Sequence, residues 1–167
     1  MKQKLALSCA LIHRPSVLFL DEPTTGVDAV SRKEFWDMLK NLRRQGITIL
    51  VSTPYMDEAG LCDRVALIQN GKILSINTPQ GIVDEFSKPL WAVKSTSMLH
   101  LLKDLQQSDF VEDVYPFGEF HHVVLKDAKA EPSLSKFIAE RLSEHAVLRQ
   151  VKPDIEDCFI ELMKEPA

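Results

Sequence analysis

The first half of the chain alternates between short apolar runs and a stretch with helical spacing. Residues 16–20 (SVLFL) and 47–53 (ITILVST) are runs of strand length bounded by chain-breaking residues, a pattern typical of strands covered on both faces. Between them, apolar side chains recur at helical spacing from a Ser31–Glu34 capping box up to Gly46. Strand, helix and strand in this order predict a parallel pair with a right-handed crossover.

Further elements follow from turn and helix signals along the rest of the chain. Residues 2–13 predict a helix that ends before Pro15, and residues 65–76 predict a hairpin, because Asn70 and Gly71 tolerate the positive φ of a tight turn. The composition shifts near residues 87–89. We therefore predict two domains: an α/β half over 1–86, and a small α+β accessory domain over 87–167.

The accessory domain is predicted from alternating strand and helix patterns. Its last helix has the clearest signals, with Asp154 at the N-cap position and an apolar stripe after it. The predicted strands are 90–95, 111–117, 120–126 and 146–151, and the predicted helices have apolar stripes within 98–105, 134–142 and 155–163.

Composition narrows the class of protein. The 167 residues are 45% hydrophobic, which is enough for a packed core. The formal net charge is −4 and neither half has a basic excess, so nucleic-acid binding is not expected. The 3 cysteines are far apart and suit reduced thiols in a cytoplasmic protein. Because no apolar run has the length of a membrane span, a membrane role is expected only through a partner.

The candidate chemistry lies at the end of the first strand, where an apolar run meets Asp21 and Glu22. An aspartate at the carboxyl end of a buried strand can hold the Mg²⁺ of a nucleoside triphosphate. A neighbouring glutamate can deprotonate an attacking water. A solvated acidic turn is the alternative explanation of these two residues taken alone.

The sequence motifs around Asp21 and Glu22 are more specific than the two acids alone. The phrases LDEPTTGVD, TILVSTPYMDEA and CDRVALIQNGKI, in this order and spacing, resemble the second half of the nucleotide-binding domain of ABC transporters, over residues 1–86. The resemblance implies a P-loop NTPase-type parallel sheet, with Asp21 as the Mg²⁺ ligand of the Walker B strand and Glu22 as the catalytic base. It places Asp28 in the D-loop, which reaches across a dimer interface, and Pro54 at the position of the switch histidine.

The second half also resembles a family pattern. PDIEDCFIEL, residues 153–162, is similar to the phrase that closes the accessory domain of ABC ATPases of the drug- and polysaccharide-export type. The resemblance implies a cytoplasmic subunit at the inner face of the cell membrane, paired with a second nucleotide-binding domain and a transmembrane permease. The full-length protein would use ATP and Mg²⁺.

Departures from the family pattern limit what this chain is expected to do alone. None of the 6 glycines belongs to a G-x-x-x-x-G-K-[ST] phosphate loop, and the Q-loop and most of the signature region are missing as well. We therefore expect a fragment that binds no nucleotide and has no ATPase activity by itself. Its uncovered strand edge favours self-association.

Pro54 leaves a second function open. Proline has neither a side-chain donor nor a backbone N–H, so it cannot make the hydrogen bond of the usual histidine. The parent is then either an ATPase in which water replaces that contact, or a degenerate, non-catalytic module that regulates or dimerises.

Two further groups are assigned structural roles. His121 and His122 are adjacent on a predicted strand, so they point to opposite faces and cannot chelate one ion. Asp57 and Glu58 are expected to cap and solvate the start of a short helix near residues 56–61.

Overall fold

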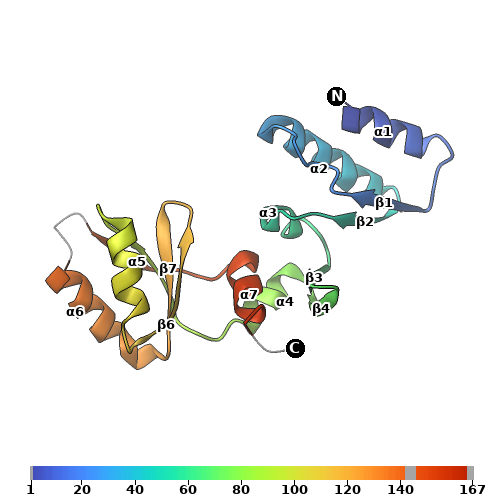
Figure 1. Cartoon of the computed structure of the whole chain (residues 1–167). Helices are drawn as coiled ribbons and strands as arrows, with labels where there is room; N and C mark the ends of the chain where they lie inside the picture. Colours follow the sequence, from blue (N-terminus) through green and yellow to red (C-terminus); the bar gives the residue numbers. More distant parts are fainter. Residues whose placement is uncertain (1, 142–145, 165–167) are drawn as a thin grey trace. The chain divides into compact units, whose positions relative to one another are not determined.

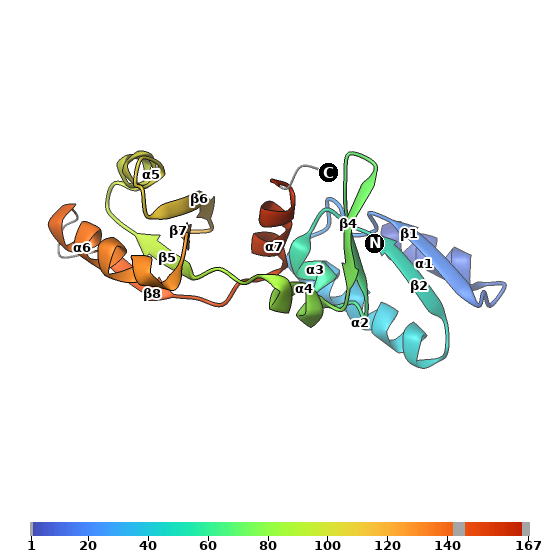
Figure 2. The same cartoon turned by 90° about the horizontal axis from the view of Figure 1, so that it is seen from below.

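The structure is a computed structural model that describes residues 2–141 and 146–164. The chain divides into two compact units, Met1–Cys62 and Asp63–Ala167. The domain boundary predicted between residues 86 and 87 rests on sequence pattern and stays a prediction. The architecture is α/β, with several small sheets and helices (Figures 1 and 2).

The first unit contains a two-stranded parallel sheet with helices beside it (Figure 1). Its strands pair in register, so that Leu18 lies opposite Ile49 and Asp21 lies opposite Ser52. The carboxyl ends of both strands therefore meet at the same edge. The elements are α1 (Lys2–Leu11), β1 (Val17–Asp21), α2 (Ala29–Arg44), β2 (Thr48–Ser52) and α3 (Met56–Ala59).

The helices α1 and α2 cover one face of this sheet. Leu7 of α1 and Phe35, Trp36 and Leu39 of α2 form a buried cluster with Leu18 of β1. Side chains on the other face are exposed.

The prediction that both strands are covered on both faces is therefore wrong for this chain. Phe19 is 73% exposed and Leu50 is 62% exposed, because successive strand side chains alternate between faces and both helices pack on the same one.

Helix α2 starts earlier than predicted. Asp28 is its N-cap, and the Asp28 carboxylate accepts hydrogen bonds from the Val30 and Ser31 backbone N–H groups at 3.1 and 3.0 Å. Ser31 lies inside the helix and cannot cap it, so the predicted Ser31–Glu34 capping box is wrong. Glu34 instead pairs with Lys4 of α1.

The second unit begins with the predicted hairpin. Strands β3 (Val65–Gln69) and β4 (Lys72–Asn77) pair in antiparallel orientation. The turn residues Asn70 and Gly71 have φ of 50° and 73°, as the turn signal predicted. Helix α4 (Pro79–Glu85) follows, with the Thr78 hydroxyl as its N-cap acceptor.

A four-stranded sheet of order β6-β7-β5-β8 forms the body of the second unit. Its strand pairs are antiparallel, and each connecting helix joins two strands that flank a third, which is the split βαβ arrangement. The elements are β5 (Leu90–Lys94), α5 (Met98–Gln106), β6 (Val111–Phe117), β7 (Phe120–Leu125), η1 (Ala128–Ala130), α6 (Glu131–Arg141) and β8 (Val147–Gln150).

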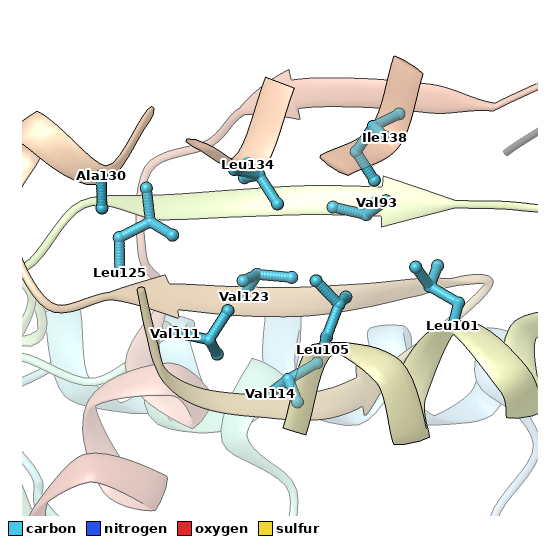
Figure 3. Packing of buried hydrophobic residues seen from close by; sticks show 10 residues of the cluster. All are labelled: Val93, Leu101, Leu105, Val111, Val114, Val123, Leu125, Ala130, Leu134 and Ile138. Carbon is cyan, nitrogen blue, oxygen red and sulfur yellow. The ribbon is translucent and has the colours of Figure 1, made fainter. Parts of the chain in front are cut away.

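Both long helices of this motif contribute to one core on one face of the sheet. Figure 3 shows Leu101 and Leu105 of α5 and Leu134 of α6 with strand residues that include Val93 and Val123. These five side chains are at most 1% exposed. The predicted apolar stripes of α5 and α6 therefore face this core, in agreement with their apolar spacing.

The final helix, α7 (Ile155–Leu162), is joined to the sheet by buried hydrogen bonds. Asp157 accepts from the Tyr115 hydroxyl at 2.8 Å and lies 2.6 Å from Nδ1 of His122. Since a carboxylate only accepts, Nδ1 donates. The ring of Phe117 stacks on His122, with centroids 4.0 Å apart. Asp154 is the N-cap of α7, as predicted, and forms a capping box with Asp157.

Candidate functional site

The candidate site lies where β1 and β2 end in the first unit. The Ser52 hydroxyl donates to Oδ1 of Asp21, directly across the strand pair. Asp21 and Ser52 are both exposed, on the sheet face opposite to the one that α1 and α2 cover. The parallel pairing thus presents a carboxylate and a hydroxyl side by side to solvent.

Glu22 is held against the same edge by its backbone. Its N–H donates to the Ser52 carbonyl at 3.0 Å and to the Ser52 hydroxyl oxygen at 3.1 Å. Its φ is 43°, a left-handed conformation that side-chain-bearing residues rarely adopt. The Thr25 hydroxyl donates to Oε2 of Glu22 at 3.1 Å, which orients the exposed carboxylate.

Asp28, predicted to reach across a dimer interface, caps α2 in this chain. The hydrogen bond from the Ser31 backbone N–H, followed by that from the Ser31 side chain, holds the pKa of the Asp28 carboxyl below its ordinary value. No contact with a second chain tests the D-loop role, so that role stays a prediction.

Pro54 is exposed in the segment between β2 and α3, two residues beyond Ser52. Its neighbour Thr53 uses its hydroxyl twice: the oxygen accepts from the Tyr55 N–H at 3.1 Å, and the hydroxyl donates to Glu58 at 2.7 Å. Pro54 itself supplies no donor. The structure thus brings Asp21, Glu22 and Pro54 to the same end of the strand pair.

Glu58 is the residue that the sequence pattern misassigned. It was expected to solvate the start of a helix, but it is 1% exposed and accepts hydrogen bonds from two threonines, Thr24 and Thr53. The side chain of Asp57 is 69% exposed, as expected for a solvated position. The predicted capping role is wrong for both residues, because Tyr55 is the N-cap of α3 and no side chain caps the helix. No local signal separates the two, because the partners that bury Glu58 come from the loops after β1 and β2.

The donor set at the strand ends fits a magnesium ion. Mg²⁺ prefers oxygen ligands and keeps several waters, and the Asp21 carboxylate and Ser52 hydroxyl offer oxygens that face solvent. The phosphate groups of a nucleotide need a cradle of backbone N–H groups and a lysine, and no G-x-x-x-x-G-K-[ST] motif occurs in these 167 residues.

The adjacent histidines of β7 have separate partners. His121 lies 2.8 Å through Nε2 from the Met98 carbonyl, while His122 pairs with Asp157. Their separate partners agree with the predicted opposite faces. No group of three or more metal-ligating side chains occurs within residues 2–141 and 146–164.

Two further observations concern the described part of the chain. None of its helices combines the length and the apolar character that crossing a membrane requires. A cavity of about 160 Å³ lies in the second unit, lined by residues that include Ile82, Lys88 and Cys158. None of the predicted site residues lines this cavity.

Comparison with known proteins gives matches over part of the chain. Over 81 residues it is 48% identical to "Probable multidrug ABC transporter ATP-binding protein YbhF" of Escherichia coli; the match spans 48% of this chain and 14% of the relative. It is 44% identical over 86 residues to "Nod factor export ATP-binding protein I" of Sinorhizobium fredii, spanning 51% of this chain and 25% of that protein.

A eukaryotic protein shows the same partial match. "ABC transporter G family member 20" of Dictyostelium discoideum is 38% identical over 85 residues, which cover 51% of this chain and 12% of the relative. No family model matches the chain. The chain thus spans a quarter or less of the length of these relatives. Over about half of its own length, this chain is homologous to ABC transporter ATP-binding proteins.

Proposed function

We propose that residues 1–86 are the Walker B half of an ATP-hydrolysing subunit that powers export across a membrane. One observation carries the proposal: the parallel pairing of β1 and β2 sets Asp21 and Glu22 beside Ser52 at the strand ends. Ligands of open parallel sheets bind at such ends. The homology to ABC transporter ATP-binding proteins supports the same assignment.

Each site residue has a distinct part in this proposal. Asp21 is a ligand of the Mg²⁺ that accompanies ATP, and Ser52 orients its carboxylate. Glu22 is the base that takes a proton from the attacking water, and the Thr25 hydroxyl fixes the direction of its carboxylate. Asp28 and Pro54 lie in the segments that contact nucleotide or a second nucleotide-binding domain. When bound, Mg²⁺ neutralises charge on the phosphates.

The partners and location belong to the same proposal. A second nucleotide-binding domain completes the ATP site, a transmembrane permease carries the substrate, and the subunit sits at the inner face of the cell membrane. The 167-residue chain alone is expected to show no saturable rise in its melting temperature with Mg-ATP, because its sequence contains no phosphate loop.

Pro54 favours a second candidate function, a degenerate nucleotide-binding module that regulates or dimerises. Its position beyond β2 offers no donor to a phosphate, whereas the intact Glu22 favours hydrolysis. The two candidate functions differ in whether the bound ATP is hydrolysed.

A chimera tests both candidates. The 81 aligned residues of the Escherichia coli relative are replaced by those of this chain, and Mg-ATP binding and steady-state ATPase rates are measured against the unmodified relative. We expect hydrolysis that falls at least about 100-fold in Glu22→Gln, since a general base contributes about 10²–10⁴-fold. Glu34→Gln, an exposed carboxylate on α2, is the matched control and leaves the rate unchanged.

The possible outcomes separate the candidates. Hydrolysis that depends on Glu22 supports the ATPase. Nucleotide binding with hydrolysis that appears only in Pro54→His supports the degenerate module. A folded chimera that hydrolyses ATP equally well with Glu22→Gln would contradict the role of Glu22.

A further inference from the structure

A buried carboxylate links the two loops that follow β1 and β2. Oε1 of Glu58 accepts from the Thr24 hydroxyl at 2.7 Å, and Oε2 accepts from the Thr53 hydroxyl at 2.7 Å. Thr24 and Glu58 are each 1% exposed. One side chain from α3 thus uses both of its oxygens to hold two segments that are far apart in sequence.

Arg32 of α2 extends this bridge to a third element. Its Nε lies 3.9 Å from Oε1 of Glu58, and its guanidinium lies 5.0 Å from the centre of the Tyr55 ring. Its Nη1 lies 3.8 Å from the Asp57 carboxylate. A carboxylate removed from water needs hydrogen bonds and a compensating charge, and Glu58 has both.

The bridge connects the positions that matter for the proposed chemistry. Thr24 comes two residues after Glu22, and Thr53 immediately precedes Pro54. Helix α3 spans only Met56–Ala59, which is far below the length of a helix that is stable in isolation. Tertiary contacts must therefore hold α3 in place, and the two threonine hydrogen bonds of Glu58 are such contacts.

We propose that Glu58 is a positioning residue that fixes the loop of Glu22 to the loop of Pro54, so that the two loops move as one body. The bridge is a feature of this chain's own structure, and its relevance to hydrolysis rests on the proposed function. Without the Glu58 hydrogen bonds, Glu22 and Pro54 would still be held by the pairing of β1 with β2. The distance between the two loops beyond the strand ends would no longer be fixed.

Amide hydrogen exchange of the whole 167-residue chain tests the bridge. In Glu58→Gln we expect exchange to become about tenfold faster in residues 24–27 and in residues 53–56 together. The amide group replaces one acceptor oxygen with a donor, and its remaining oxygen is no longer a charged acceptor. Asp57→Asn is the matched control. It lies on the same helix and also faces Arg32, but its side chain is 69% exposed, and we expect no change in residues 24–27.

Isosteric hydroxyl deletions give a readout that a purely local role would not move. Thr53→Val should speed exchange in residues 24–27, and Thr24→Val should speed exchange in residues 53–56, because each deletion weakens the bridge from one side. Thr53→Ser keeps the hydroxyl and should restore protection. In the Glu58→Gln background, either valine substitution should add little to the opposite loop.

The results separate this inference from the proposed function, because hydrogen exchange requires no nucleotide. If each valine substitution affects only its own loop, or if Asp57→Asn acts like Glu58→Gln, the bridge does not couple the loops. Should Glu58→Gln fail to fold, the valine and serine variants still decide the question. If the loops are coupled in this chain but the chimera binds no ATP, the positioning role of Glu58 is supported and the proposed function is contradicted.

Discussion

Replacing Asp157 with alanine removes the acceptor that joins α7 to the four-stranded sheet. Asp157 is 1% exposed and accepts from the Tyr115 hydroxyl at 2.8 Å, from Nδ1 of His122 at 2.6 Å and from the Asp154 backbone N–H at 2.9 Å. With alanine at this position, the half-buried Tyr115 hydroxyl and the buried His122 ring N–H both lose their acceptor. We expect the free energy of unfolding of the second unit to fall by about 3–4 kcal/mol, because each buried donor left without its acceptor costs about 1–3 kcal/mol.

Urea unfolding measured by tryptophan fluorescence provides the assay. The chain has 2 tryptophans, one in each compact unit, so Trp36→Phe leaves Trp91 of β5 as the reporter of the second unit. With a slope of about 1.5 kcal/mol/M, the midpoint should fall by about 2–3 M. Asp127→Ala is the control, since Asp127 is an exposed cap and its loss costs at most about 1 kcal/mol.

The pH dependence of the difference in urea midpoint between wild type and Asp157→Ala provides a second check. Burial raises the pKa of Asp157, but hydrogen bonds from His122, the Asp154 amide and Tyr115 outweigh it and hold the pKa below its ordinary value. A lowered carboxyl pKa contributes stability that is present above the unfolded pKa of about 3.9 and is lost as the pH falls through the folded pKa.

The midpoints of wild type and Asp157→Ala should therefore approach each other below about pH 4. Midpoints that agree within 0.5 M at pH 7, or a gap that stays constant at low pH, would refute the reasoning.

Three further predictions concern the second unit and the cysteines. Leu134→Ala should lower the free energy of unfolding by about 2–5 kcal/mol, because Leu134 is 0% exposed. Leu99 is 64% exposed, so Leu99→Ala should cost under about 0.5 kcal/mol in the same urea titration. Asp154→Ala should cost about 1 kcal/mol and Asp154→Asn almost nothing, since both Asp and Asn cap well; thermal unfolding distinguishes them. In a thiol titration at pH 8, Cys9, which is exposed, should react in the native protein and Cys158 only after unfolding, because burial raises the pKa of the Cys158 thiol to about 12.

Local signals in the sequence were sufficient for most of the elements. The turn at Asn70 and Gly71, the N-cap at Asp154 and the apolar stripe of α5 each act over a few residues, so their consequences do not depend on distant parts of the chain. The start of α2 shows the limit of such signals. Asp28 and Ser31 are both good caps, and only the path of the chain after β1 decides that Asp28 is used.

Some residues of the candidate site could be predicted from the sequence, and others only from the fold. The words around Asp21 and Glu22 identify their relatives, and the strand pattern predicts that they lie at a strand end. The neighbour across the pair, Ser52, follows only from the register of β1 against β2. Glu58 could not be placed from its own segment, because its partners Thr24 and Thr53 are brought to it by the fold.

The sequence by itself determined the class of elements, the acid pair and the homology to ABC transporter ATP-binding proteins, because periodicity, turn chemistry and motif wording are local properties. Only the tertiary structure decided which polar groups lose water. Glu58 and Asp157 both lie on short helices with other acids beside them, yet each is 1% exposed and bonded to elements far away in the chain. Burial depends on packing between elements, and a carboxylate without water must take its hydrogen bonds from whatever the fold places next to it.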